Sequence, residues 1–168
     1  MIQTERLLLR PMVAADAGPL LRVFADPRVM ASFGVAPFGS EQMEQWVARN
    51  LAHQDAHGYG LFSVLLNESG LLIGDCGLTR MELNGASEVE LGYDLRSDYW
   101  NQGLATEAAR AVRDYAFAVL LLPRLVSLVR QGNRASRRVA EKVGMRFAAD
   151  LVEDGRDYWL FALERAGG

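Results

Sequence analysis

At 168 residues, half of them hydrophobic and 23% charged, the chain is long enough for one domain whose core needs no disulfide or metal. The net charge of −3 argues against general nucleic-acid binding, and the lone Cys76 excludes an intramolecular disulfide. No apolar run reaches the roughly 18 residues of a membrane span, and the first residues lack a signal-peptide core. We therefore expect a single cytoplasmic domain over 1–168, with no nucleic-acid or membrane partner.

The first quarter of the chain is predicted to begin with a strand and a helix. The strand runs over 6–10 and is closed by Pro11, because proline cannot donate to a sheet ladder. A helix follows over 14–25, with a cap near Asp16.

A second helix is predicted after two proline breaks at Pro27 and Pro37. Ser40 is its expected cap, and the helix ends near His57. His53 and His57 are four residues apart, a spacing that can bind zinc. The Glu that completes the His-Glu-x-x-His pattern is missing, so an exposed helix face is expected there and no metal site is assigned.

Three strands are predicted in the middle of the chain. Segments 60–66 and 71–79 flank the turn 67–70 and are typical of a hairpin. Segment 88–95 alternates polar and apolar residues strictly, which indicates a strand covered on one face.

The last third alternates helices and strands. A helix begins near Leu104, a strand follows over 125–130, and a helix runs over 135–143 before strands 145–149 and 157–164. This order predicts a mixed α/β (α+β) domain.

The segment between the strand 88–95 and the helix that begins at Leu104 offers a place for a phosphate. Gly103 stands at a strand-to-helix turn, where a glycine lets the backbone approach a ligand closely. The first turn of a helix has unpaired N–H groups and the positive end of the helix dipole. The chain has neither the P-loop pattern nor the dinucleotide fingerprint, so this signal is weak by itself.

Several segments, taken in order, resemble the GNAT (GCN5-related) N-acetyltransferases, and most closely their Rim-type branch of ribosomal-protein N-terminal acetyltransferases. The resemblance spans nearly the whole chain. The general pattern Gln/Arg-x-x-Gly-x-Gly/Ala has Trp100 in its first place here, with Gly103 and Ala105 following. The segments that carry the resemblance are 4–11, 26–30, 73–78, 90–93, 99–108 and 133–145.

This resemblance implies a mostly antiparallel central sheet, flanked by helices, in which two parallel strands splay apart. They are 88–95 and 125–130, the fourth and fifth strands of the family fold, and acetyl-CoA lies in the gap. Its pantetheine arm pairs with backbone at Asp94, Leu95 and Arg96, and the Leu95 N–H stabilises the oxyanion. Its pyrophosphate sits on Gln102, Gly103, Leu104, Ala105 and Thr106.

Further candidate residues follow on the next helix. Asn133 is expected to contact the cofactor arm or to cap the helix. Ser136 is the candidate general acid for the leaving thiolate, or an inert first-turn serine. Arg138, with Arg134 and Arg137, can reach the adenosine phosphates or form a solvated face.

Glu90 is the candidate general base, with a structural ion pair as the alternative. Related enzymes often carry a Glu on the strand after the coenzyme helix, but 125–130 has none. Cys76 lacks the neighbours that activate a nucleophile and is expected to pack in the core. The aromatic residues Trp46, Tyr59 and Trp100 are also expected to pack, and the first two can wall the acceptor site.

The predicted activity is acetyl transfer from acetyl-CoA to an amine by direct attack in a ternary complex, without a metal. The Rim-type resemblance favours a protein or peptide N-terminal α-amine. A small amine such as a polyamine or an antibiotic, or a non-catalytic acetyl-CoA-binding module, are the alternatives. Domains of this family often pair, so a homodimer is also expected.

Overall fold

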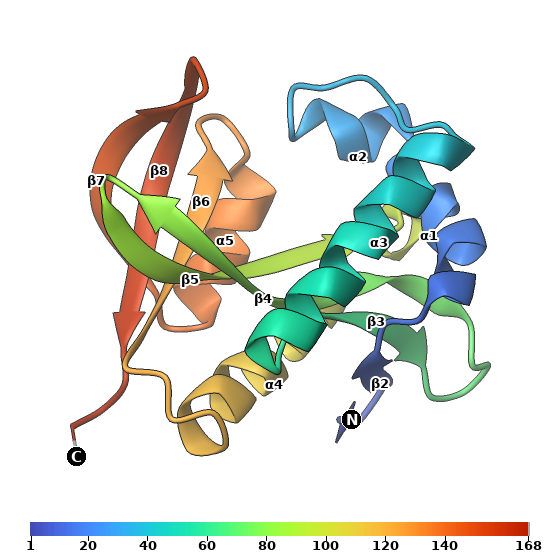
Figure 1. Ribbon diagram of the computed structural model, residues 1–168, viewed down its shortest axis with the longest axis horizontal. Coiled ribbons are helices and arrows are strands. Elements are labelled where there is room, and N and C mark those ends of the chain that lie inside the picture. Colours follow the sequence, from blue (N-terminus) through green and yellow to red (C-terminus); the bar gives the residue numbers. More distant parts are fainter. Residues whose placement is uncertain (168) are drawn as a thin grey trace.

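A mostly antiparallel sheet runs through the structure, a computed structural model that describes residues 1–167 (Figure 1). Within these residues eight strands lie in the order β1-β2-β3-β4-β5-β6-β8-β7, and every neighbouring pair is antiparallel except β5 and β6. The strands are β1 (Ile2–Gln3), β2 (Leu7–Pro11), β3 (Leu61–Leu66), β4 (Leu72–Leu83), β5 (Ala86–Leu95), β6 (Arg124–Arg130), β7 (Arg146–Glu153) and β8 (Arg156–Glu164). The mixed sheet with one parallel pair is thereby confirmed.

Helices cover both faces of the sheet and bury two apolar clusters. They are α1 (Ala17–Phe24), α2 (Pro27–Ala31), α3 (Ser40–His57), α4 (Leu104–Ala118) and α5 (Arg134–Lys142). The first three form one cluster, and α3 runs diagonally across the near face of the sheet in Figure 1. Side chains of α4 and α5 form the other cluster with residues of β2 to β6. None of the described helices combines the length and the apolar character needed to cross a membrane.

Four of the predicted strands, 71–79, 88–95, 145–149 and 157–164, extend further at the ends that face each other, and they form two hairpins with tight turns. Asn84 and Gly85 both have positive φ, 50° and 78°, and they join β4 directly to β5. Asp154 and Gly155, at 48° and 71°, join β7 to β8 in the same way. Asn-Gly and Asp-Gly are the pairs that two-residue hairpin turns favour, so the signal for both turns is present in the sequence.

The helix α2 corrects the prediction that Pro27 is a break. Asp26 caps this helix by accepting the Arg28 N–H at 2.9 Å, and Pro27 occupies the first helical position, where a missing N–H has no cost. The predicted cap of α3 is also wrong by one residue. Gly39 is the N-cap, and its own N–H donates to the Gln42 side chain at 2.7 Å.

The predicted helix over 14–25 is a 3₁₀ turn (Ala14–Asp16) followed by α1, and Asp16 is the N-cap residue of α1, although its side chain makes no cap bond to that helix. Its buried carboxylate instead binds three groups. The Arg10 guanidinium donates to it at 2.7 and 2.8 Å, the Val13 N–H at 2.9 Å and the Ser63 hydroxyl at 2.7 Å. These bonds tie the α1 entry to β2 and β3. The strand β2 also includes Pro11, at its end, and β1 was not predicted.

Candidate active site

A cleft of about 1120 Å³ opens between β5 and β6. These parallel strands pair at a single register position, Glu90 with Val126, and then separate. Most of the residues that the sequence assigns to the cofactor line the cleft, from β5, the start of α4 and the start of α5. They are Asp94, Leu95, Gly103, Leu104, Ala105, Thr106, Asn133, Ser136 and Arg138.

Two side chains replace the backbone ladder where β5 and β6 part. The Ser127 hydroxyl donates to the Leu91 carbonyl at 2.5 Å, and the Leu128 N–H donates to the Glu90 carboxylate at 3.2 Å. Each bond satisfies a backbone group that would otherwise lose its partner at the split. Ser127 was not predicted to have a role, although a serine inside an apolar strand is a signal for one.

Beyond this split, the backbone N–H and C=O groups of β5 that point toward the gap have no partner in β6. The Arg96 N–H donates to the Ile73 carbonyl in β4 at 2.8 Å. Backbone groups alternate sides along a strand, so those of Tyr93 and Leu95 point toward β6. The Leu95 carbonyl accepts the Trp100 indole N–H at 2.9 Å. The Leu95 N–H has no partner in β6, because the two strands pair only at Glu90 and Val126. Trp100, expected to be a packing residue, is 42% exposed and fixes this backbone.

The start of α4 presents three free N–H groups to the cleft. Gly103 is its N-cap with φ of 77°, a conformation that residues with a side chain rarely adopt. The first bond of the helix runs from the Glu107 N–H to the Gly103 carbonyl at 3.0 Å. The N–H groups of Leu104, Ala105 and Thr106 therefore have no acceptor in the helix, and they can bind a phosphate.

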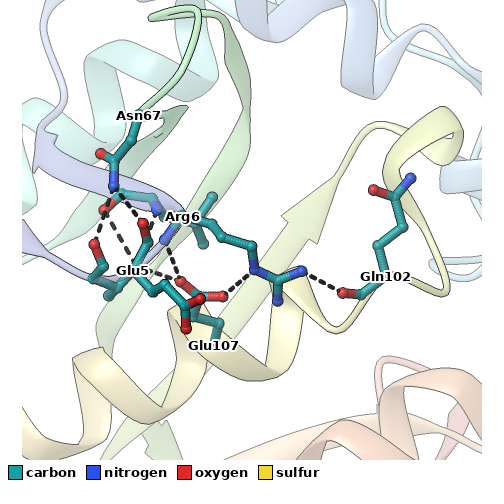
Figure 2. Close-up of polar contacts among 7 residues, drawn as sticks. Glu5, Arg6, Asn67, Gln102 and Glu107 are labelled. Atoms are coloured by element: carbon teal, nitrogen blue, oxygen red, sulfur yellow. Dashed lines mark hydrogen bonds and ion pairs between the residues drawn. The ribbon is translucent and has the colours of Figure 1, made fainter.

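An N-terminal residue holds this glycine turn in place (Figure 2). The Arg6 guanidinium donates to the Glu107 carboxylate at 2.7 Å and to the Gln102 carbonyl at 2.8 Å. The same carboxylate accepts the Thr4 hydroxyl at 2.6 Å and the Arg6 N–H at 2.8 Å. Burial opposes ionisation of Glu107, but these donors together lower its pKa. The carboxylate in the first turn of α4 is thus neutralised by Arg6 and does not oppose an anion there.

Two predicted cofactor residues lie outside the lining of the cleft. The Arg96 guanidinium pairs with Asp98 at 2.7 Å and lies over the Tyr99 ring. The Gln102 side chain donates to the Asp98 carbonyl at 3.3 Å, and its carbonyl is bound to Arg6. Both residues therefore stabilise the loop before α4.

The wall formed by α5 brings Ser136 to Tyr93. The Asn133 side chain accepts the Ser136 N–H at 3.1 Å, so this asparagine caps the helix. The Ser136 hydroxyl donates to the Tyr93 hydroxyl at 3.2 Å, which in turn donates to the Ser136 carbonyl at 2.8 Å. Burial raises the pKa of Tyr93, which keeps its hydroxyl protonated.

Of the arginines on α5, Arg138 lines the cleft, and Lys142 lies near it on the same helix. Arg137 pairs with Glu141 at 2.9 Å and lies over the Trp159 ring, 4.8 Å from its centre, so it is engaged elsewhere. Arg134 is exposed and is absent from the lining. Arg138, from the predicted arginine cluster, and Lys142, which was not predicted, can therefore reach a ligand in the cleft.

Three carboxyl groups with raised pKa values lie on the adjacent strands β4 and β5, namely Asp75, Glu90 and Asp94. Asp94 lines the cleft, and burial followed by the charge of Glu90 raises its pKa to about 7. Asp75, paired with Asp94 across the strands, is wholly buried, and neither of its oxygens has a hydrogen-bond partner among the described residues. Burial and then Asp94 raise its pKa well above the usual range. Burial also raises the pKa of Glu90.

Cys76 is fully buried in the core, as predicted, and burial raises the pKa of its thiol. A raised pKa suppresses the thiolate and is the opposite of what a nucleophile needs.

The far half of the cleft, between β6 and the helices α2 and α3, is lined by Phe33, Trp46, His53 and Arg130. Trp46 thus walls this half, whereas Tyr59 packs against the core and is absent from the lining. His53 is half-buried and accepts the Arg80 N–H at 2.9 Å. The expected exposed face therefore holds for His57 alone.

The comparisons with known proteins agree with this geometry. Residues 6–146 match the family model of the acetyltransferase (GNAT) domain. The chain is 33% identical over 149 residues to YkkB of Bacillus subtilis (strain 168), a match that covers 88% of this chain and 86% of that protein. An acetyltransferase from Agrobacterium tumefaciens has a TM-score of 0.83 at 34% identity, covering 97% of this chain and 93% of that one. The ribosomal alpha-N-protein acetyltransferase RimL, solved in complex with coenzyme A, shares the fold, with a TM-score of 0.78 at 16% identity over 96% of this chain and 95% of that one.

Proposed function

Because the chain belongs to the GNAT acetyltransferase family, we propose that it transfers the acetyl group of acetyl-CoA to the α-amine of a protein or peptide N-terminus. Acetyl transfer is the activity of the family. The α-amine is our assignment, and the structural likeness to RimL and the protonation states of the site support it. The observation that carries the proposal is the row of free N–H groups at Leu104, Ala105 and Thr106, beside the gap between β5 and β6.

The residues of the cleft fit acetyl-CoA. The free N–H groups of the first turn of α4 would bind its pyrophosphate, with Gly103 leaving the approach open. Arg138 and Lys142 would face its other phosphate from α5. The unpaired edge of β5 at Tyr93 and Leu95 would pair with the pantetheine amides, as another strand would, whereas the Asp94 backbone, predicted to do so, faces β4. When bound, acetyl-CoA supplies an activated acyl group.

The reaction needs one proton acceptor, one proton donor and a site for developing negative charge. The amine nitrogen forms a bond to the thioester carbon, and the carbon–sulfur bond breaks. The Leu95 N–H would stabilise the charge on the carbonyl oxygen. The proton released by the amine goes to a carboxylate of the cleft, and the thiolate takes a proton from a hydroxyl of α5 or β5.

We assign the proton acceptor to Asp94 in place of Glu90. A general base works best when its pKa lies near the operating pH, and the pKa of Asp94 is about 7. Asp94 is also next to Leu95, where the carbonyl oxygen would lie. Glu90 is four residues away, roughly 13 Å along the strand, and its carboxylate accepts the Leu128 N–H. Glu90 thus acts as a positioning residue that also raises the pKa of Asp94.

Ser136 is the proposed proton donor, with the Tyr93 hydroxyl beside it as the other candidate. Ser136→Ala is expected to lower kcat by about 10²-fold, the lower end for a general acid, because a thiolate is a weak base. The affinity for acetyl-CoA should stay nearly unchanged, since the bond forms in the transition state. Tyr93→Phe is the matched variant. If it lowers kcat while Ser136→Ala does not, the tyrosine is the acid.

An α-amine acceptor is expected to react about 100-fold faster than a lysine side chain. Attack requires a neutral amine, and near pH 7.4 roughly a quarter of α-amines are neutral, against about one lysine in a thousand. A base with a pKa of about 7 can assist the first far more easily than the second. The measurement is thiol release from acetyl-CoA with two peptides, one unblocked and lysine-free, the other N-terminally blocked with a free lysine.

The comparison contradicts the α-amine assignment if the blocked lysine peptide reacts as fast as the unblocked one. Turnover confined to polyamines or antibiotics would contradict it as well. Binding of acetyl-CoA without turnover of any amine would indicate a non-catalytic module. In each of these outcomes the cofactor site still stands, because it rests on different residues.

A further inference from the structure

An unpaired guanidinium lies in the acceptor half of the cleft, on Arg130 at the end of β6. Its Nη1 atom is buried and has no hydrogen-bond partner among residues 1–167. None of the ion pairs within that part of the chain includes Arg130. A buried charged donor without an acceptor is costly, and a bound ligand that supplies the acceptor would explain it.

The guanidinium is held in place before any ligand binds. Its central carbon lies 5.7 Å from the centre of the Tyr158 ring. Gly34, in the loop after α2, also lies close to it, and a methyl group added there would lie only 3.0 Å from Nη1. A donor that packs near a ring and a backbone loses less freedom when it binds, so its position is suited to recognition.

Arg130 points away from the phosphate site. Val129 packs in the core cluster with residues of α4 and α5. Because successive side chains of a strand alternate faces, Arg130 lies on the opposite face, beside α2 and α3. The free N–H groups of α4 lie on the Val129 side. We therefore infer that the group bound by Arg130 is not a phosphate of the coenzyme but a part of the acceptor.

Arg130 and Asp94 occupy equivalent positions on the two strands that border the gap. Glu90 and Val126 lie level with each other in parallel strands, and four residues further on the two strands reach Asp94 and Arg130. An even number of residues preserves the face, so both side chains lie on the acceptor face. Both side chains line the cleft, and none of the ion pairs among residues 1–167 joins them.

We propose that the acceptor is an amine that also carries a carboxylate, with its amine beside Asp94 and its carboxylate bound by Arg130. This inference rests on the proposed acetyl transfer to an α-amine and specifies the substrate. The carboxylate can be that of a free amino acid or of an acidic residue next to a peptide N-terminus. A polyamine has no carboxylate to offer, and its charge is repelled by Arg130.

Two acceptor pairs test the proposal by thiol release from acetyl-CoA. One pair is alanine and alaninamide, and the other is the amidated tripeptides Ala-Asp-Ala and Ala-Asn-Ala. In at least one pair, Arg130→Gln should lower kcat/KM for the carboxylate acceptor by about 10- to 100-fold, the worth of a charge-assisted hydrogen bond, and leave the amide acceptor almost unchanged. The pair that responds identifies the source. Comparing enzymes on the same acceptor cancels differences in amine basicity.

Arg22→Gln is the matched control, because it removes the same charge from the exposed side of α1, away from the cleft. It should leave both pairs unchanged, and Arg130→Lys should keep part of the preference. The proposal is wrong if Arg130→Gln affects acid and amide acceptors alike. If no acceptor releases thiol, the proposed transfer fails. Calorimetry of the four acceptors with the protein saturated in coenzyme A then decides, and equal affinities within each pair would overturn the carboxylate site.

Discussion

The variant Gly103→Val is expected to bind acetyl-CoA about 10³-fold more weakly than the wild type. Gly103 has φ of 77°, and a β-branched residue avoids this region, so the turn before α4 would have to change its course. The free N–H groups of Leu104 to Thr106 would then lose their common direction. Losing about two charge-assisted hydrogen bonds, each worth about 1.5–3 kcal/mol, accounts for a change of this size. Isothermal titration calorimetry with acetyl-CoA measures it.

Gly70→Val is the matched control for backbone strain. Gly70 has φ of 68° in the turn between β3 and β4, no other atom lies near its missing side chain, and it is not part of the cleft lining. It should lose a similar amount of stability and keep its affinity for acetyl-CoA. Undiminished binding by Gly103→Val, or an equal loss in both variants, would contradict a specific phosphate site at this turn.

The variant Asp94→Asn is expected to lower kcat/KM for an α-amine by about 10³-fold, within the usual range for a general base. In the wild type kcat/KM should rise with pH through about 7, as Asp94 loses its proton. This inflection should vanish in the variant and leave only the one due to the amine. Glu90→Gln should keep most of the rate, because the amide oxygen can still accept the Leu128 N–H. Removing the Glu90 charge should move the inflection to lower pH, since that charge raises the pKa of Asp94.

Stability measurements separate this effect from unfolding. The pKa of Asp94 is higher in the folded protein than in the unfolded chain, so its contribution to stability is complete below about pH 4 and declines as the pH rises to about 7. Asp94→Asn removes that decline, so its Tm relative to the wild type should be higher at pH 8 than at pH 5. A fully active Asp94→Asn enzyme, together with an inactive Glu90→Gln enzyme, would return the base to Glu90.

The regular parts of the fold could be predicted from the sequence, because they depend on local signals. The alternation of 88–95 and the glycine before Leu104 indicate β5 and the start of α4 correctly. Two features that differ from the prediction also have local signals. Pro27 starts α2 because it follows the capping Asp26, and the Asn84-Gly85 pair forms the turn between β4 and β5.

The residues whose backbone forms the candidate site could also be predicted from the sequence, because they belong to motifs that are continuous along the chain. The side-chain contacts of the site could not be predicted in this way. The bond between Ser127 and the Leu91 carbonyl depends on how two strands separate. The raised pKa of Asp94 depends on burial beside Glu90, and the guanidinium of Arg130 lies beside Gly34, about a hundred positions away in the chain. No short stretch of sequence contains these relations.

The bonds from Arg6 to the turn before α4 have a consequence for folding. They join residues 96 and 101 positions apart, so they close a loop of about three fifths of the 168-residue chain. Closing so long a loop has an entropic cost that is recovered only after the intervening sheet has assembled. A nascent or partly folded chain would therefore hold the turn loosely and bind coenzyme poorly. Coenzyme binding in this protein would report that the segment from Arg6 to Glu107 has folded.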